Sequence, residues 1–405
     1  MKTIDRFLKY IEIDTQSDSD SASSPSTKKQ FDLANILAKE LKELGLNPTL
    51  DEHCYVYAFL KSNTSTKIDK IGFIAHMDTA PDASGKGVNK RIIHNYDGTT
   101  IQLNDILSMS PKNFNCLNTV IGDDLIVTDG TTLLGADNKA GVAEIIGLIE
   151  YIQSNKDFKH GDIYICFTPD EEIGRGTDHF NFDLFKADYA YTVDGGDVNV
   201  ISYETFNAAS ASIKFIGKSI HPGSAKDKLV NAINLAVEFH NLLPVHQRPE
   251  HTDGYDGFNH ITSIKGEVEN ASSNYIIRNH SKIIFENQKE IFKTIATYIN
   301  KKYGYNAVDL TIKDSYYNMK EILKDKMEIV DIASKAIANV GLTPGFEAVR
   351  GGTDGARLTF DGIPCPNLGT GGFNFHGPFE FLSVNQMNKA VEVLIEIVKI
   401  VSNKG

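Results

Sequence analysis

Three short apolar segments, each followed directly by acidic or histidine residues, constrain the fold of this chain more than any other feature. They are Ile71–Ala75, Ile163–Phe167 and Tyr189–Val193, and each is rich in β-branched or aromatic residues. Such runs are typical of strands buried on both faces of a parallel sheet. Helical patterns separate and follow them, at 139–152, 327–340 and 384–401. The sequence therefore predicts an α/β fold with a mostly parallel sheet.

The section between residues 208 and 319 has a different pattern. Its predicted elements are, in order, a strand at 211–217, a helix at 227–243, strands at 257–269 and 274–286, a helix at 289–302 and a strand at 307–317. This order is typical of an α+β two-layer sandwich. We therefore expect a catalytic domain made of residues 1–207 and 320–405, interrupted by an inserted lid domain at 208–319.

The N-terminal region combines an amphipathic helix with a polar segment that precedes it. Apolar residues recur at helical intervals between Lys28 and Leu44, and Gly45 provides a C-terminal cap. The preceding segment, Ser17–Ser26, consists mainly of turn-forming and uncharged polar residues, which cannot bury apolar surface. We expect Ser17–Ser26 to form a surface loop.

Charge and cysteine content exclude several classes of function. The chain has 41 basic and 53 acidic residues and a formal net charge of -12, which disfavours nucleic acid or an anionic membrane as partner and suits a small substrate or a cation. The four cysteines form no CxxC pair, so neither a disulfide framework nor a thiolate zinc site is indicated. Charged residues interrupt the N-terminal apolar segment, and no apolar stretch reaches about 18 residues. We expect a cytoplasmic protein.

Acidic and histidine residues gather where the predicted strands end. His76 and Asp78 follow the first strand, Glu171 and Glu172 the second and Asp194 the third, while Asp137 directly precedes the helix at 139–152. Ligands bind beyond the carboxyl ends of strands in open α/β sheets. Carboxylates that converge there repel one another unless cations neutralise them, and imidazole with carboxylate suits Zn²⁺, Mn²⁺ or Co²⁺. The sequence therefore predicts a metal site.

The spacing of these residues suggests individual roles. Residues two apart in an extended segment point to the same side, so Asp78 can hold the far nitrogen of His76. The adjacent residues Glu171 and Glu172 cannot easily share one task. If one of them binds metal, the other is free to act as a general base on an activated water.

Seven motifs resemble, in order and approximate spacing, those of the tripeptide aminopeptidases in the M20 family of di-zinc metallopeptidases. They are HMDT at 76–79, GADNKAG at 135–141, PDEEIGRG at 169–176, TVDGG at 192–196, SIHPGSAKDKLVNA at 219–232, RGGTDGARL at 350–358 and NFHGPFE at 374–380. The similarity spans essentially the whole chain. The concurrence of all seven motifs is far more specific than any one of them.

The resemblance implies a site with two Zn²⁺ per chain, for which Co²⁺ or Mn²⁺ could substitute. It makes His76 and Asp194 ligands of one metal, Glu172 and His376 ligands of the other, and Asp137 the bridge between them. It also implies a cis peptide bond between Asp137 and Asn138. The pattern of strands alone does not indicate His376, which lies in an irregular glycine-rich stretch.

The resemblance further assigns catalytic roles. Glu171 matches the general base, Asp78 a carboxylate behind the metal ligands, and His221 a lid histidine that steadies the oxyanion. Arg278 in the lid and Arg350 in the catalytic domain are candidates to bind a peptide carboxylate, because a guanidinium group binds carboxylates bidentately. A surface or domain-interface salt bridge is the alternative for either arginine.

The predicted function is hydrolysis of the N-terminal peptide bond of tripeptides, by a water that Glu171 activates between the two metals. An M20-type deacylase, dipeptidase or carboxypeptidase with the same metal site is the alternative. A non-catalytic peptide- or metal-binding protein is a further alternative, which the presence of Glu171 opposes. The inserted domain mediates dimers in many relatives but not all, so a homodimer through this domain is also an expectation.

Overall fold

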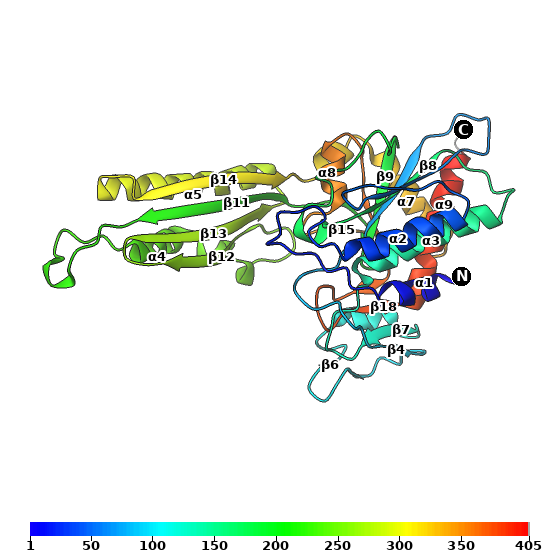
Figure 1. The fold of residues 1–405 in the computed structure, drawn as a ribbon, viewed down its shortest axis with the longest axis horizontal. Helices are drawn as coiled ribbons and strands as arrows, with labels where there is room; N and C mark the ends of the chain where they lie inside the picture. Colours follow the sequence, from blue (N-terminus) through cyan, green and yellow to red (C-terminus); the bar gives the residue numbers. More distant parts are fainter. Residues whose placement is uncertain (404–405) are drawn as a thin grey trace. The chain divides into compact units, whose positions relative to one another are not determined.

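The computed structural model describes residues 1–403, which form two compact units (Figure 1). The first unit contains Met1–Tyr203, Glu321–Glu347 and the residues from Thr353 onward, and the second contains Glu204–Lys320 and Ala348–Gly352. The second unit thus takes in 348–352, which lie outside the expected insertion at 208–319. Hydrogen bonds explain this: the Val349 N–H donates to the Glu204 carbonyl (2.9 Å) and the Phe206 N–H to the Gly351 carbonyl (3.1 Å). The expectation that Arg350 belongs to the catalytic domain is therefore wrong.

The first unit is built on an eight-stranded sheet with parallel strands at its centre. The strands, in spatial order, are β1 (Thr49–Leu50), β2 (Val56–Leu60), β8 (Ile163–Thr168), β3 (Ile71–His76), β9 (Tyr189–Gly195), β16 (Asn367–Gly369), β10 (Val200–Glu204) and β15 (Gly345–Ala348). β3 pairs in parallel with both β8 and β9, whereas β2 and β10 pair antiparallel with their neighbours β8 and β16. The α/β fold and its three buried strands are confirmed, and antiparallel pairing is confined to the outer strands.

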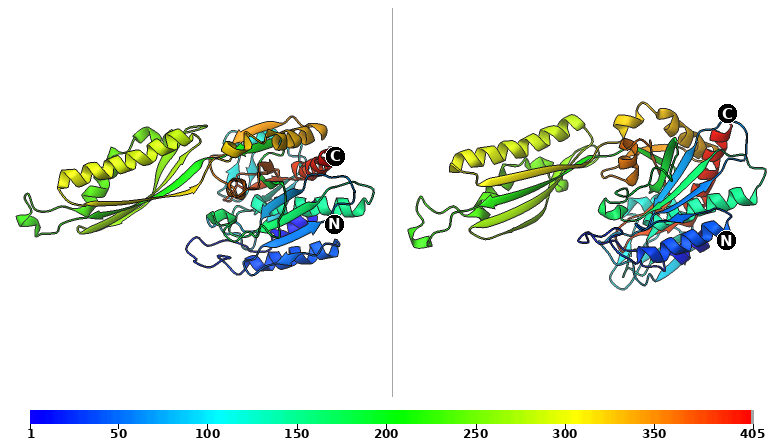
Figure 2. Two further views of the ribbon diagram at one scale, coloured as in Figure 1. Left: turned by 90° about the horizontal axis from the view of Figure 1, so that it is seen from above. Right: turned by 45° about the horizontal axis from the view of Figure 1, so that its top comes forward.

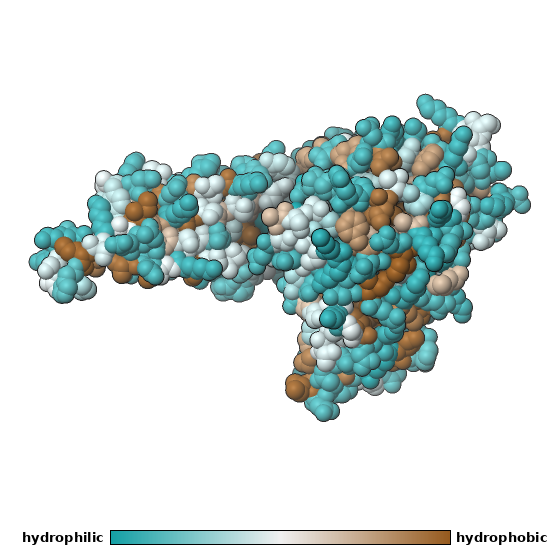
Figure 3. Space-filling model, in the orientation of Figure 1, coloured by the Kyte–Doolittle hydropathy of each residue, from teal (hydrophilic) through white to brown (hydrophobic). Residues whose placement is uncertain are grey.

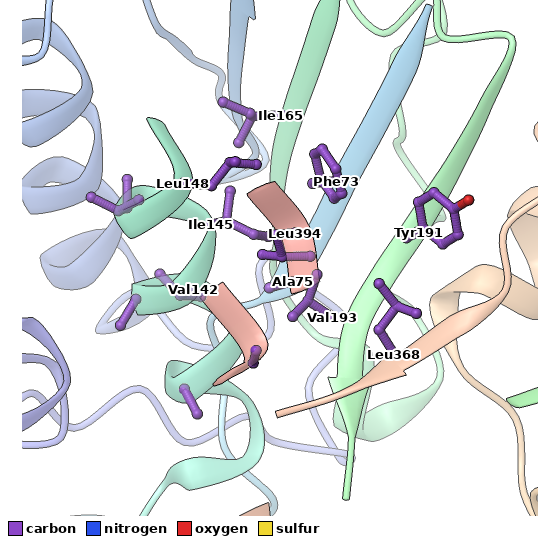
Figure 4. Packing of buried hydrophobic residues seen from close by; sticks show 14 of the residues in the cluster. Phe73, Ala75, Val142, Ile145, Leu148, Ile165, Tyr191, Val193, Leu368 and Leu394 are labelled. Atoms are coloured by element: carbon purple, nitrogen blue, oxygen red, sulfur yellow. The ribbon is translucent and has the colours of Figure 1, made fainter. Parts of the chain in front are cut away.

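Helices and loops cover both faces of this sheet. The helices are α1 (Thr3–Tyr10), α2 (Gln30–Glu43), α3 (Ala136–Ser154), α7 (Met327–Asn339), α8 (Asp354–Phe360) and α9 (Val384–Ser402). Side chains alternate along β3: Phe73 and Ala75 pack in the main core with α3 and α9, as Figure 4 shows, whereas Ile74 packs on the other face with Leu358 of α8. Burial on both faces stabilises the strands, at roughly 1.5–3 kcal/mol per large apolar side chain.

A smaller sheet in the first unit lies outside the sequence prediction. Its strands, in spatial order, are β17 (Gly372–Phe373), β18 (Phe381–Ser383), β7 (Leu125–Thr128) and β4 (Lys90–Ile93), and β5 (Ile101–Gln102) pairs separately with β6 (Ser108–Met109). Phe373 pairs directly with Phe381, so the residues between them form a closed connection. This connection carries His376.

The segment Ser17–Ser26 forms no helix and no strand among the described residues, and its middle is the predicted surface loop, with Asp18, Ser19, Asp20, Ala22 and Ser23 exposed. Its two ends differ. Ser17, Pro25 and Ser26 are buried. Hydrogen bonds to neighbouring segments, rather than apolar contacts, account for this burial. The α2 helix follows and begins at Gln30, within the predicted helical range.

The second unit is a two-layer α+β sandwich. Its antiparallel sheet has the order β12 (Phe258–Gly266), β13 (Asn270–Asn279), β11 (Asn207–Ile216) and β14 (Val308–Tyr316). Figure 2 shows α4 (Ala232–Leu242) and α5 (Lys282–Tyr303) lying along these strands. Buried and exposed residues alternate along most of β11, so the two helices cover one face.

Two predicted boundaries in the second unit are wrong because of helix caps. The strand expected at 274–286 ends at Asn279, since the Ser281 hydroxyl accepts a hydrogen bond from the Ile284 N–H and begins α5. The helix expected at 227–243 begins only at Ala232, since the Asn231 side chain accepts from the Ile233 N–H. Ser and Asn are preferred at the N-cap of a helix, because their side chains accept a hydrogen bond from a backbone N–H of the first turn.

Figure 3 shows mainly hydrophilic residues on the visible face, with smaller hydrophobic patches between them. Among the helices of residues 1–403, none combines the length and apolar character that a bilayer span needs.

Candidate metal centre

The predicted metal ligands come from five separate segments of the first unit. His76 ends β3, Asp194 lies near the end of β9, Glu172 lies in the short 3-10 helix η2 (Glu171–Ile173) after β8, Asp137 lies in the first turn of α3, and His376 lies between β17 and β18. The structure brings all five side chains together at the carboxyl ends of β3, β8 and β9. The Asp137–Asn138 peptide bond is cis, as expected.

The five ligands form two groups that share Asp137. In the first group, His76 Nε2 lies 2.9 Å from Asp137 Oδ1 and 3.3 Å from Asp194 Oδ1. In the second group, His376 Nε2 lies 3.1 Å from Asp137 Oδ2 and 2.9 Å from Glu172 Oε2. The ligand atoms of each group lie within 4.8 Å of one another. Asp137 therefore offers one carboxylate oxygen to each group.

Burial and mutual charge shift the pKa values of these groups. Burial raises the pKa of Asp194 to about 6, and burial together with the charge of Asp137 raises the pKa of Glu172 to about 8. Hydrogen bonds to Asp137 and Glu172 raise the pKa of His376 to about 11. The two histidines lower the pKa of Asp137 although burial opposes them. Two imidazoles alone are thus not enough to neutralise the negative charge of these closely packed, buried carboxylates.

The donor set fits two divalent cations. Glu172 Oε1 and Asp194 Oδ1 are buried and accept no hydrogen bond among the described residues, although His76 Nε2 lies 3.3 Å from Asp194 Oδ1. An unpaired buried carboxylate oxygen is costly. A cation would satisfy both atoms. Imidazole nitrogen and carboxylate oxygen suit Zn²⁺ and similar metals, and three protein ligands in a group leave a coordination position open, as in catalytic sites.

Asp78 lies directly behind the ligands and holds the segment that follows β8. Its buried carboxylate accepts hydrogen bonds from the Glu171 N–H (3.0 Å) and the Glu172 N–H (3.2 Å). His76 Nδ1 lies 3.0 Å from the Asp78 carbonyl oxygen and 3.4 Å from its carboxylate. The carbonyl is therefore the nearer partner, and a proton on Nδ1 leaves Nε2 free to bind metal. The Asp78 carboxylate mainly orients the two glutamates.

Glu171 lies beside the ligands but belongs to neither group. Its carboxylate lies 4.0 Å from His76 Nε2, and burial raises its pKa well above the ordinary value. A carboxylate with a raised pKa close to a metal site is suited to accept a proton from water near neutral pH. The two adjacent glutamates are thus placed for different tasks.

Glu380 is a site residue that the sequence prediction missed. Its buried carboxylate accepts hydrogen bonds from the backbone N–H groups of Leu134 (2.7 Å), Gly135 (2.9 Å) and Asp137 (3.0 Å). Burial raises its pKa to about 7. Glu380 therefore fixes the turn that presents Asp137. The only signal for it in the sequence is its place at the end of the NFHGPFE motif.

The other three predicted site residues lie in the second unit. His221 is exposed and precedes the 3-10 helix η3 (Pro222–Ser224), and its Nδ1 accepts from the Gly223 N–H (3.1 Å). Arg278 donates through Nη1 to the carbonyl oxygens of Ala209 and Ile277 and lies over the ring of Tyr316. Arg350 donates through Nη1 and Nη2 to three oxygen atoms of residues 252–256. Their roles toward a substrate stay predictions.

Comparisons with known proteins agree on one family. Residues 132–400 match peptidase family M20/M25/M40. A peptidase T from Clostridium perfringens is 54% identical to this chain over 100% of both proteins. The crystal structure of the aminopeptidase PepT from Bacillus cereus superposes with a TM-score of 0.77 at 24% identity, covering 98% of each chain. A dinuclear metal binding peptidase of the M20 family from Bacillus subtilis gives a TM-score of 0.66 at 16% identity, covering 99% of this chain and 98% of the other.

Replacing Glu380 with Gln tests whether this residue positions Asp137. The NH₂ group of Gln cannot accept a hydrogen bond. At least one of the three backbone N–H groups that now donate to Glu380 would therefore lose its acceptor, and the turn should shift. Outer-shell substitutions cost roughly 10–100-fold in metal affinity, and we expect a loss in this range for Zn²⁺ in a chelator competition titration. The exposed Glu347→Gln serves as control. Unchanged affinity in Glu380→Gln would show that the turn holds Asp137 without it.

Proposed function

This chain belongs to peptidase family M20/M25/M40, and we propose that it cleaves the N-terminal peptide bond of tripeptides at the metal centre described above. The observation that carries the proposal is the Asp137 carboxylate, which contributes to both ligand groups while Glu171 lies beside them. Two-metal hydrolases combine such a shared site with a free base. The full-length similarity to a peptidase T at 54% identity supports tripeptides as substrates and aminopeptidase activity.

We propose two Zn²⁺ as the resident cations, with Co²⁺ or Mn²⁺ as substitutes. His76, Asp137 and Asp194 would hold one ion, and Asp137, Glu172 and His376 the other. When bound, such ions polarise the scissile carbonyl and lower the pKa of water toward neutrality. The donor types and the buried carboxylate oxygens that accept no hydrogen bond support this choice.

Glu171 is the proposed general base. Its carboxylate accepts a proton from the attacking water and returns that proton to the leaving amine. Two observations support this role: Glu171 lies outside both ligand groups, and its backbone N–H is held by Asp78. Asp78 thereby holds the backbone of Glu171 close to the ligand groups.

Residues of the second unit are proposed to bind the substrate. His221 would donate a hydrogen bond to the oxyanion, and an exposed imidazole is available for this role. Arg278 and Arg350 would bind the peptide carboxylate. Arg278 contacts its two carbonyl partners through Nη1 alone, whereas Arg350 uses both Nη1 and Nη2 for residues 252–256. Arg278 is therefore the better candidate of the two.

A cytoplasmic location, a homodimer through the inserted domain, and the lack of a nucleic-acid or membrane partner remain predictions. The acidic net charge supports the last of these.

A substrate panel tests the proposed reaction. Chelator-treated protein should be inactive, and adding two equivalents of Zn²⁺ per chain should restore release of the free N-terminal residue from tripeptides. Dipeptides and N-acetylated tripeptides should be poor substrates. Faster cleavage of dipeptides, release of the C-terminal residue, or hydrolysis of the N-acetyl group would indicate a dipeptidase, a carboxypeptidase or a deacylase. Binding without turnover in the zinc-loaded protein would indicate a non-catalytic protein.

Substitution of the two adjacent glutamates separates their roles. Glu171→Gln should lower kcat by roughly 10²–10⁴-fold, the usual contribution of a general base, while the protein keeps two metals per chain. Glu172→Gln should instead lower metal content, because it removes a ligand oxygen from the second group. Metal analysis after dialysis and tripeptide kinetics measure both effects. Equal metal loss in the two variants would contradict this division.

His221→Ala tests the proposed oxyanion contact. We expect kcat to fall by roughly 10²–10³-fold, the scale for one oxyanion donor, with both metals and the circular dichroism spectrum retained. His246→Ala, another exposed histidine of the second unit, is the matched control and should keep full activity. A near-normal kcat in His221→Ala would rule out a catalytic contact for this residue.

A further inference from the structure

The N-terminal segment Thr15–Ser26, here called the brace, is bonded to the chain that follows His76. The Ser17 N–H donates to the Thr79 carbonyl (3.1 Å), and the Thr79 N–H donates to the Thr15 carbonyl (3.4 Å). The Gln16 side chain donates to two further carbonyls of the same segment, at residues 80 and 83. The brace is therefore attached to the segment that carries His76 and Asp78.

The brace is also bonded to Asp170, the residue directly before Glu171. The Ser26 N–H donates to Asp170 Oδ2 (2.7 Å), and the Ser26 hydroxyl donates to Asp170 Oδ1 (2.5 Å). Gln30, at the start of α2, donates through Nε2 to the same Oδ1 (2.7 Å). Asp170 is 1% exposed, Ser26 6% and Gln30 0%. A fully bonded, buried polar network of this kind holds its members rigidly.

A third attachment follows the glutamates. Arg175 donates through Nη1 to the Ser21 carbonyl (2.9 Å) and through Nη2 to the Ser23 carbonyl (2.7 Å). The short segment that carries Glu171 and Glu172 is thus bonded to the brace on both sides.

The hydrogen bonds to Asp170 stabilise an unusual backbone conformation of this residue. Its φ of 56° lies in the left-handed region, which non-glycine residues adopt only when their surroundings stabilise it. The side chain of Asp170 supplies this stabilisation through Ser26 and Gln30. Rotation at Asp170 would turn the following residue, and with it the carboxylate of Glu171.

We propose that the brace positions the general base: Ser26 and Gln30 hold Asp170, and Asp170 sets the direction of the Glu171 carboxylate. Ser26, Gln30 and Asp170 are then positioning residues, which act on the reaction through Glu171. This inference rests on the role of Glu171 in the proposed function. Asp78 holds the N–H of Glu171 from the other side, so loss of the brace should misdirect the base without releasing the metal ligands.

Ser26→Ala removes the hydroxyl that donates to Asp170 and keeps the backbone N–H. We expect kcat for a tripeptide to fall roughly tenfold, less than the ~10²-fold cost of a 1 Å misplacement, with KM and two metals per chain unchanged. Ser26→Thr should restore kcat, because it keeps the hydroxyl. Ser21→Ala makes the same chemical change in the brace, but the Ser21 hydroxyl bonds only within the brace, so its kcat should stay normal.

Gln30→Met provides a second route, because at similar volume it removes the other side-chain donor to Asp170 and also the Oε1 atom that accepts from the Asp170 N–H (3.3 Å). It should reproduce the selective loss of kcat. A fall in metal content together with kcat in both Ser26→Ala and Gln30→Met would overturn the inference, since the brace would then support the whole site and not the base. Normal kcat in both would overturn it as well.

A double-substitution cycle tests whether the effect passes through Glu171. In the Glu171→Gln background, Ser26→Ala should leave the residual kcat unchanged, because the base that it positions is gone. A further tenfold loss in that background would overturn the inference. A Glu171→Gln variant with full activity would instead refute the proposed general base, whatever the effect of Ser26→Ala in the otherwise unchanged chain.

Discussion

Buried negative charge at the end of the parallel strands is the constraint on which the site depends. Asp137, Glu172 and Asp194 converge there with two histidines, and Glu171 lies beside them. Repulsion between such groups favours any movement that separates them. Backbone N–H groups oppose this movement by donating to two carboxylates outside the ligand groups, those of Asp78 and Glu380. These bonds fix the backbone that carries Glu172 and Asp137.

Close packing of α3 against the sheet brings two ligands of the first group, Asp137 and Asp194, close together. A Cβ atom at Gly141 would lie 1.9 Å from the carbonyl oxygen of Val193, so only glycine allows the helix to approach β9 this closely. Val193 directly precedes Asp194, and Gly141 lies four residues after Asp137. One contact between backbones thus brings the shared carboxylate of Asp137 within reach of Asp194. The buried strands and the metal centre depend on the same packing.

Strands and helices with a clear apolar pattern, and ligands with characteristic side-chain chemistry, could be predicted from the sequence. Ile71–Ala75, for example, is a strand because its residues alternate between two buried faces. The resemblance indicated His376, which no strand or helix pattern marks. Glu380 was missed because its partners are backbone N–H groups, which have no sequence signal. The sequence predicted the exposed middle of Ser17–Ser26 but not its buried ends, because their burial depends on hydrogen bonds to Asp170 and Thr79, distant in sequence, and not on apolar side chains.

The short helix η2 explains how two adjacent glutamates can serve different tasks. A 3-10 helix has about three residues per turn, so successive side chains diverge by roughly 120°. Glu172 accordingly reaches His376 Nε2 at 2.9 Å, while Glu171 lies toward His76 at 4.0 Å. Both N–H groups bond to the single carboxylate of Asp78. Displacing this helix would therefore disturb metal binding and proton transfer together. A rotation at Asp170, which precedes the helix, can instead change the direction of Glu171 while the hydrogen bond from the Glu172 N–H to Asp78 remains.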